Sequence, residues 1–363
     1  MMIRRTVAGV VALLLVVTGW SLTSALRAPG DDTVTKLAEW GRDHGLGPVV
    51  TLAESIQYRL NPPVTGGTPD ASILAAGSHG AGSGHSTSAA VDSALPRVVS
   101  PVAPALAGEG VWVPTVTSTS GPLVQETYVR PDAVHTSYLT GMAWMSHRLR
   151  FALHPGYQDP GTTGFTLADQ IVPSEYSTLV ATFNGGFKLK DARGGVYDHG
   201  TTVGTLTPGA ASFVVYADGH ATVGTWGKDV SLTSDVVFVR QNLLPLIAHG
   251  RVAGNLDGNV ESAWGATLGG AYAVWRSGIG VTRSGDLVYV AGDALTVSAL
   301  ADLLHRAGAV TAMQLDINKA WISYMTYTHS AGHVVPHKLV QFDRPATRYL
   351  QPTSRDFIAA YRP

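Results

Sequence analysis

Two segments of the chain place polar residues directly after an apolar run that favours a strand. Residues 181–187 read ATFNGGF, so Asn184, Gly185, Gly186 and Phe187 follow such a run. Paired glycines let backbone amides approach a ligand closely and donate hydrogen bonds to an anionic oxygen. The alternative is a plain hairpin turn, because Asn-Gly is the commonest hairpin signal.

The second segment delivers an acid. Residues 314–321 read QLDINKAW, so Asp316 stands at the carboxyl end of an expected strand. Side chains at strand ends protrude from a rigid scaffold, which is a common location for working residues. An Asp after a strand is also a frequent turn former, and this alternative stays open.

The motifs for metals and cofactors are missing. His329, His333 and His337 are four residues apart, but Gly332 and Pro336 prevent the helix that would bring them together. The chain has no Cys, which excludes thiolate ligands and disulfides. There is also no Gly-Lys-Ser/Thr phosphate loop and no dinucleotide fingerprint. We therefore expect neither a metal nor a cofactor.

Local patterns predict the elements that position Asp316. Thr296 is a suitable N-cap, apolar residues repeat at helical spacing over 297–307, and Gly308 is the expected stop. The following residues, 309–315, favour a strand that leads directly to Asp316. A helix followed by a short strand would thus hold the acid.

The rest of the globular part is rich in strands. Turns at Asp218-Gly219 and Ser284-Gly285 predict hairpins over residues 212–223 and 279–290. Residues 179–183 and 236–239 are apolar enough to be strands covered on both faces. With 41 Gly and 20 Pro, long helices cannot dominate. We expect an α+β domain with a mixed, largely antiparallel β-sheet and a few packed helices.

Composition excludes some classes of protein. The chain has 25 Lys and Arg against 26 Asp and Glu, and only 14% of its residues are charged. A dedicated nucleic-acid binder would normally carry a basic face, so we expect no nucleic-acid partner.

The amino terminus indicates export. Arg4 and Arg5 precede an apolar run over residues 6–26, which is close to the length that spans a bilayer as a helix. An uncleaved signal anchor with its amino end inside is one interpretation, and a cleaved signal peptide is the other. Either places the domain outside the cytoplasm, in the cell membrane by a single pass or secreted.

Four regions follow from these patterns. Residues 1–28 form the anchor or signal peptide, and residues 31–61 form two short membrane-proximal helical pieces, 31–44 and 49–60. Residues 62–96, rich in Gly, Ala, Ser, Pro and Thr, are expected to be a flexible linker. The globular domain spans residues 97–363.

The order of the polar segments resembles the phosphodiester glycosidase family, whose founding member removes N-acetylglucosamine from a sugar phosphodiester. In that family a strand ends in Asn-Gly-Gly-Phe/Tyr, here Asn184 to Phe187. An Arg before a small residue and a Gly follows, here Arg276. After a hairpin and a helix, the last strand reads Leu-Asp-Gly-Gly-Gly-Ser. This chain keeps the acid as Asp316, but Ile317, Asn318 and Lys319 replace the glycines.

The resemblance implies hydrolysis of a sugar 1-phosphodiester of N-acetylglucosamine type, with cell-envelope glycans as the expected substrate. Asp316 would stabilise positive charge at the anomeric carbon or activate water, and Arg276 would clamp the phosphate. Asn184 with its glycines would form a hydrogen-bonding cradle. The altered loop favours a second hypothesis, a catalytically silent relative that binds envelope carbohydrate or serves as a membrane-tethered interaction protein.

Further residues are expected to contact the substrate. Lys188 or Lys319 would act as an auxiliary cation, although both fit ordinary surface charges equally well. Trp264 offers a flat face for a sugar ring, and its alternative is a place in the core. Asn318 and Phe187 would line the same pocket.

Overall fold

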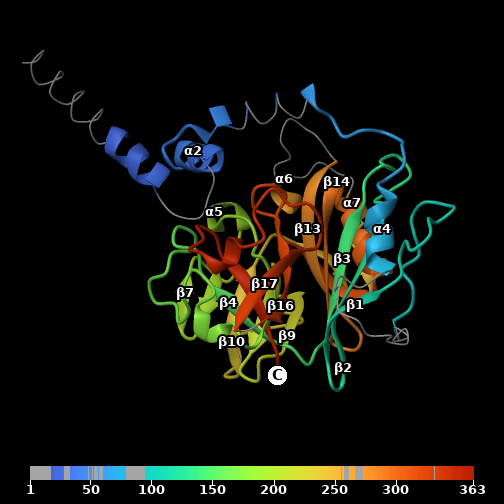
Figure 1. The fold of residues 1–363 in the computed structure, drawn as a ribbon. Coiled ribbons are helices and arrows are strands. Elements are labelled where there is room, and N and C mark those ends of the chain that lie inside the picture. Colours follow the sequence, from blue (N-terminus) through green and yellow to red (C-terminus); the bar gives the residue numbers. More distant parts are fainter. Residues whose placement is uncertain are drawn as a thin grey trace, which may run out of the picture.

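Three antiparallel β-sheets build the domain (Figure 1). The computed structural model describes residues 18–27, 33–47, 49–50, 52, 56, 60–78, 95–254, 256, 261–265, 273–330 and 332–363. The expected largely antiparallel architecture is confirmed, because every pairing between named strands is antiparallel.

The largest sheet has eight strands. In spatial order they are β1 (Val113–Ser118), β2 (Gly121–Val129), β3 (Thr140–Met145), β14 (Leu287–Leu295), β13 (Val274–Thr282), β15 (Ala309–Gln314), β11 (Pro245–Ala248) and β12 (Arg251–Val252). β13 pairs with β14 on one side and with β15 on the other, so it occupies the interior of the sheet. The hairpin expected over residues 279–290 is the end of the β13–β14 pair.

Two five-stranded sheets complete the domain. One runs β7 (Thr201–Val203), β6 (Val196–Asp198), β10 (Val236–Gln241), β8 (Ala211–Tyr216) and β9 (Ala221–Thr225). The other runs β17 (His333–Lys338), β16 (Tyr324–Ser330), β5 (Leu179–Asn184), β18 (Phe357–Tyr361) and β4 (Arg150–His154). All six residues of β5 are buried, as the apolar run predicts.

One amphipathic helix covers the large sheet. Helix α7 (Val297–Arg306) begins at Thr296, whose hydroxyl accepts a hydrogen bond from the Ala299 amide, as the N-cap pattern predicts. Its buried residues pack against β13, β14 and β15, and Gly308 follows with a φ of 94°. The shorter helices are α5 (Leu189–Ala192), α6 (Glu261–Trp264) and the 3₁₀ turns Pro173–Glu175 and Arg348–Leu350.

The main core lies where the sheets face one another. Phe183, Phe213, Tyr289 and Tyr324 are each at most 1% exposed and form a contiguous aromatic cluster. A second apolar cluster fills the space between the large sheet and α7. The large sheet is therefore covered on both faces, and its central strands are apolar on both sides.

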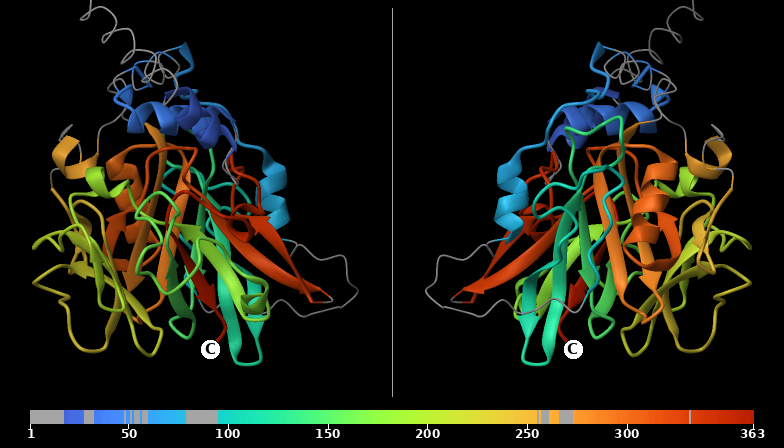
Figure 2. Two further views of the ribbon diagram at one scale, coloured as in Figure 1. Left: turned by 90° about the vertical axis from the view of Figure 1, so that its left-hand side faces the viewer. Right: turned by 90° about the vertical axis from the view of Figure 1, so that its right-hand side faces the viewer.

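The amino-terminal segment includes helix α2 (Thr33–Asp43), which agrees with the helix expected over 31–44. Figures 1 and 2 show α2 over one end of the sheets. No helix within the described part of the chain is long and apolar enough to cross a membrane. Most of the expected signal anchor, residues 1–17 and 28, lies outside the described residues, as does much of the second helical piece at 49–60.

Part of the expected linker lies against the domain. Helix α4 (Ala71–Ser78) buries Leu74, which is 5% exposed, and runs alongside the strands (Figure 1). Upstream of it, the Gly66 amide donates to the Val134 carbonyl at 2.7 Å. Within residues 62–78 of the expected linker, an apolar side chain and a backbone hydrogen bond thus contact the domain. Residues 79–94 lie outside the described part.

Candidate functional site

The ends of β5, β13 and β15 meet at one place. Leu315 and Asp316 continue the β15 ladder, since the Ser277 amide donates to the Asp316 carbonyl at 2.9 Å. From the facing sheet, Asn184 at the end of β5 donates through Nδ2 to the Ser277 hydroxyl at 3.1 Å. Both polar residues predicted from strand ends are thus brought together, with Ser277 between them.

The Asn184 side chain makes several hydrogen bonds at this contact. Its Nδ2 also donates to the Gly185 carbonyl, while its Oδ1 accepts from the Tyr289 hydroxyl at 2.8 Å and the Ser323 amide at 3.2 Å. An amide side chain offers two donors and two acceptor sites, so all four are used within the protein. Asn184 therefore fixes the relative position of β5, β13 and the strand-end loops.

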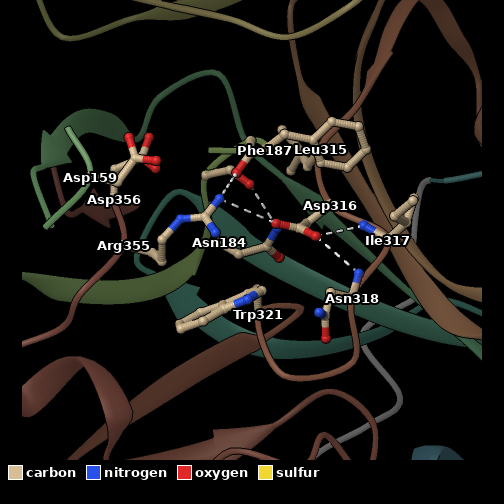
Figure 3. Close-up of polar contacts among 12 residues, drawn as sticks. Asp159, Asn184, Phe187, Leu315, Asp316, Ile317, Asn318, Trp321, Arg355 and Asp356 are labelled. Carbon is tan, nitrogen blue, oxygen red and sulfur yellow. Dashed lines mark hydrogen bonds and ion pairs between the residues drawn. The ribbon is translucent and has the colours of Figure 1, made fainter. Parts of the chain in front are cut away.

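The Asp316 carboxylate is held in a defined orientation. Its Oδ1 accepts hydrogen bonds from the amides of Ile317 at 2.7 Å and Asn318 at 2.9 Å, and Oδ2 lies 3.6 Å from Arg355 Nη2 (Figure 3). Asp316 is 4% exposed. Burial raises the pKa of this carboxyl to about 6, and the Arg355 guanidinium opposes that shift.

Arg355 comes from the segment that leads into β18. Its Nη2 also donates to the Gly186 carbonyl at 3.0 Å, so it links the acid to the glycine turn after β5 (Figure 3). The next residue, Asp356, forms a buried ion pair with Arg240 at 2.6 Å. Arg240 in turn donates to the Phe187 carbonyl. This second pair anchors the base of the turn.

Trp321 lies beside Arg355 and is 3% exposed (Figure 3). The guanidinium carbons of Arg344, Arg348 and Arg355 lie 4.8, 5.3 and 5.1 Å from its ring centroids. Such contacts are favourable because the face of an aromatic ring is negative. Three cations therefore gather around one indole next to Asp316.

The glycine turn differs from the expected amide cradle. The Gly185 amide donates to the Asp356 carbonyl, and the Phe187 amide donates to Asn242 Oδ1 at 3.1 Å. A Cβ on Gly185 would lie 2.5 Å from the Asp356 carboxylate. The glycines are thus needed for close packing, and the amides of Gly185 and Phe187 are used within the fold.

Arg276 lies on the other face of β13 from Ser277, because neighbouring strand residues point to opposite faces. Its Nε donates to the Leu295 carbonyl at 2.8 Å, and Nη1 donates to Gln314 Oε1 at 3.0 Å. Gln314 in turn donates to the carbonyl of Trp264, which is 3% exposed in the core beneath α7. Arg276 thus interacts with Leu295 and Gln314, and Trp264 with Gln314, whereas the Asp316 carboxylate interacts with Ile317, Asn318 and Arg355.

Three further residues expected to contact the substrate are at least partly exposed, namely Lys188, Asn318 and Lys319. Lys319 pairs with Asp343 at 3.2 Å and is about half exposed, and Lys188 precedes α5 and is partly exposed. Asn318 shapes the loop, since its Oδ1 accepts from the Ala320 amide at 2.9 Å. Within the described ranges, no group of three or more His, Asp or Glu side chains is placed to hold a metal ion.

Four residues around the site were not predicted from the sequence, namely Arg355, Asp356, Ser277 and Tyr289. A signal existed for the first two, because they directly precede the apolar strand β18 in the same way that Asn184 and Asp316 follow theirs. Ser277 and Tyr289 carried no signal, since they lie inside strands and their role depends on which sheet faces them.

The central part of the chain matches a known protein family. The family model described as phosphodiester glycosidase matches residues 177–316, which confirms the resemblance inferred from the sequence. The match begins just before β5 and ends at Asp316, so it includes Asn184 and Asp316 but not Arg355. No curated protein matches the chain significantly.

Two solved structures are similar over part of the chain. A hypothetical protein from Synechocystis aligns with a TM-score of 0.35 and 13% identity over 66% of this chain and 62% of its own. This chain thus spans less than two thirds of that protein. A protein from Burkholderia pseudomallei K96243, described as a presumed exported protein, aligns with a TM-score of 0.36 and 11% identity over 61% of this chain and 74% of its own.

Proposed function

We propose that this chain, whose residues 177–316 match the phosphodiester glycosidase family, hydrolyses a sugar 1-phosphodiester, with Asp316 as the central carboxylate. The observation that carries the proposal is the carboxylate itself. Two backbone amides orient Oδ1, while Oδ2 is directed toward a buried guanidinium, that of Arg355.

The chemistry of the reaction fits these two groups. Cleavage at an anomeric carbon develops positive charge on the sugar ring, which a carboxylate stabilises directly or through a water that it activates. Cleavage of the C1–O bond adds water to the sugar and releases a phosphate monoester. Because that leaving group is a weakly basic anion, a strong general acid is not required. A guanidinium matches the oxygens of phosphate in charge and geometry, and we assign this role to Arg355 rather than Arg276.

Asn184 has a positioning role in this proposal. Its four hydrogen bonds are used inside the protein, and it holds Ser277, whose backbone pairs with Asp316. We therefore expect substitutions of Asn184 to act by moving the carboxylate. Asn318 positions it from the other side through its own amide.

We further propose that the reaction takes place outside the cytoplasm, on glycans of the cell envelope. Support comes from Arg4 and Arg5 followed by the apolar run over residues 6–26. An N-acetylglucosamine-type sugar is the first candidate, because the founding activity of the family acts on it.

A second candidate is a silent relative that binds envelope carbohydrate. Two observations favour it: Trp321 covers the guanidinium groups beside Asp316, and Ile317, Asn318 and Lys319 stand where the family has glycines. The two candidates differ in one measurable property, which is turnover.

The test measures sugar released from a synthetic N-acetylglucosamine 1-phosphodiester by the full chain, held in a non-glycosidic detergent. We expect Asp316→Asn to lower the rate by roughly 100-fold or more. The matched control is Asp302→Asn, because Asp302 is about half exposed on α7 and pairs with Arg306 on the same helix. Equal rates for the wild type and Asp316→Asn would refute the assignment, and release by neither would favour the silent relative.

A further inference from the structure

A cleft lies toward the other end of β13 and β15, the strands that carry Ser277 and lead to Asp316. It has a volume of about 690 Å³ and opens between the β8–β9 hairpin and the large sheet. Val281 of β13 and Thr311 of β15 line it, whereas Ser277 and Asp316 lie at the opposite ends of the same two strands. Four residues of strand separate Ser277 from Val281, which is about 13 Å.

Three histidines surround the cleft, and each is held by a carboxylate. His147 Nδ1 lies 2.7 Å from Asp286, His220 Nδ1 lies 2.5 Å from Asp218, and His249 Nε2 lies 3.2 Å from Asp229. These side chains are 57%, 49% and 78% exposed. A ring held through one nitrogen has a fixed orientation and keeps its other nitrogen for a ligand.

The chemistry of the lining excludes two classes of ligand. Among the described residues that line the cleft, none is Lys or Arg, and carboxylates stand behind all three histidines, so an anion would find little positive charge. A metal ion is excluded by position, because no three such side chains in the described part of the chain can share one. These features favour a neutral polar ligand.

A flat aromatic surface borders the cleft. The rings of Tyr216 and His220 stack with centroids 4.3 Å apart and an angle of 5° between their planes. Apolar side chains, among them Val223, Val281 and Val310, line the cleft, and the hydroxyls of Thr222, Ser284 and Thr311 lie among them. Apolar surface with a few convergent polar groups is typical of a small-molecule site, and the volume falls in the usual range.

We propose that this cleft binds a neutral saccharide. Sugar rings combine apolar C–H faces, which suit the Tyr216–His220 surface, with hydroxyls that match the histidine nitrogens and threonine hydroxyls. If the proposed function holds, the cleft retains one part of a glycan polymer while another part reaches Asp316. Such a second attachment raises the effective concentration of the substrate without any new contact at the catalytic carboxylate.

The test titrates the full chain, in a non-glycosidic detergent, with chitotetraose and separately with maltotetraose, and measures Kd by calorimetry. We expect at least one to bind with a Kd of about 1 mM or tighter. Tyr216→Ala and His220→Ala should each weaken binding by about threefold to tenfold, while Tyr216→Phe retains it. His333→Ala is the matched control, because His333 is also exposed but lies on the β16–β17 hairpin.

Hydrolysis separates this proposal from the proposed function. A small synthetic phosphodiester does not reach the cleft, so Tyr216→Ala should cleave it at the wild-type rate whether or not saccharide binding is lost. Absence of binding by the wild type at about 10 mM of either probe would overturn the saccharide site. Equal affinity of the wild type, Tyr216→Ala and His220→Ala would overturn it as well. Binding of inorganic phosphate that His220→Ala abolishes would reassign the cleft to anions.

Discussion

The hydrolytic rate of this protein should decrease as the pH drops below 7, and the midpoint of that decrease should equal the pKa of Asp316. Burial raises the pKa of its carboxyl from 3.8 to about 6, and the proposed reaction needs the ionised form. At pH 5 only about one molecule in ten would carry the carboxylate, so kcat/KM should be about tenfold below its plateau. Above pH 7 the rate should no longer depend on this group.

Substitution of Arg355 tests whether Asp316 causes this pH dependence. Its guanidinium, 3.6 Å from Asp316 Oδ2, lowers the pKa of the carboxyl and so opposes burial. An opposite charge at this range shifts a pKa by about 1–3 units. In Arg355→Gln the acid limb of the profile should therefore move to higher pH by about that amount, and Arg355→Lys should keep it near the wild-type position.

The assay is kcat/KM for the synthetic phosphodiester from pH 4.5 to 9, measured on both variants and on Glu126→Gln. Glu126 is the necessary control, because burial raises its pKa to about 7 and it could produce a similar limb. We expect the limb to persist in Glu126→Gln. A limb that disappears in that variant, or one that Arg355→Gln leaves in place, would refute the assignment of the profile to Asp316.

Three further predictions concern stability. Burial raises the pKa of Glu126 from its ordinary value of 4.5 to about 7 in the folded protein, so its contribution to the free energy of unfolding is present at low pH and lost as pH rises through 7. Urea denaturation should therefore show Glu126→Gln to be more stable than the wild type by about 3 kcal/mol at pH 8 and equally stable at pH 4. Gly185→Ala should cost about 1–3 kcal/mol in the same assay, because its Cβ would clash with the Asp356 carboxylate, whereas Gly254→Ala has open space and should be neutral. Thr296→Ala should cost about 1 kcal/mol through the lost N-cap of α7, and Thr296→Ser should recover most of it, so equal melting temperatures for the two would contradict the capping argument.

Local patterns in the sequence were sufficient for several elements. The β8–β9 and β13–β14 hairpins, the N-cap at Thr296 and the strand β15 all depend on neighbours a few residues away. Such features follow from turn conformation, side-chain periodicity and capping, which act within one element. The placement of Asn184 and Asp316 at strand ends belongs to this class.

Tertiary structure alone decided what surrounds the acid. Arg276 precedes Ser277 in the chain, yet strand alternation sends its side chain to the α7 face and leaves Ser277 with Asn184. Arg355 reaches Asp316 because β18 pairs with β5, an arrangement that joins residues more than 150 positions apart. Local sequence patterns identify candidate residues, but they do not specify the strand register or which faces of the sheets pack together. Register and packing determine which charged side chain lies beside a buried carboxylate.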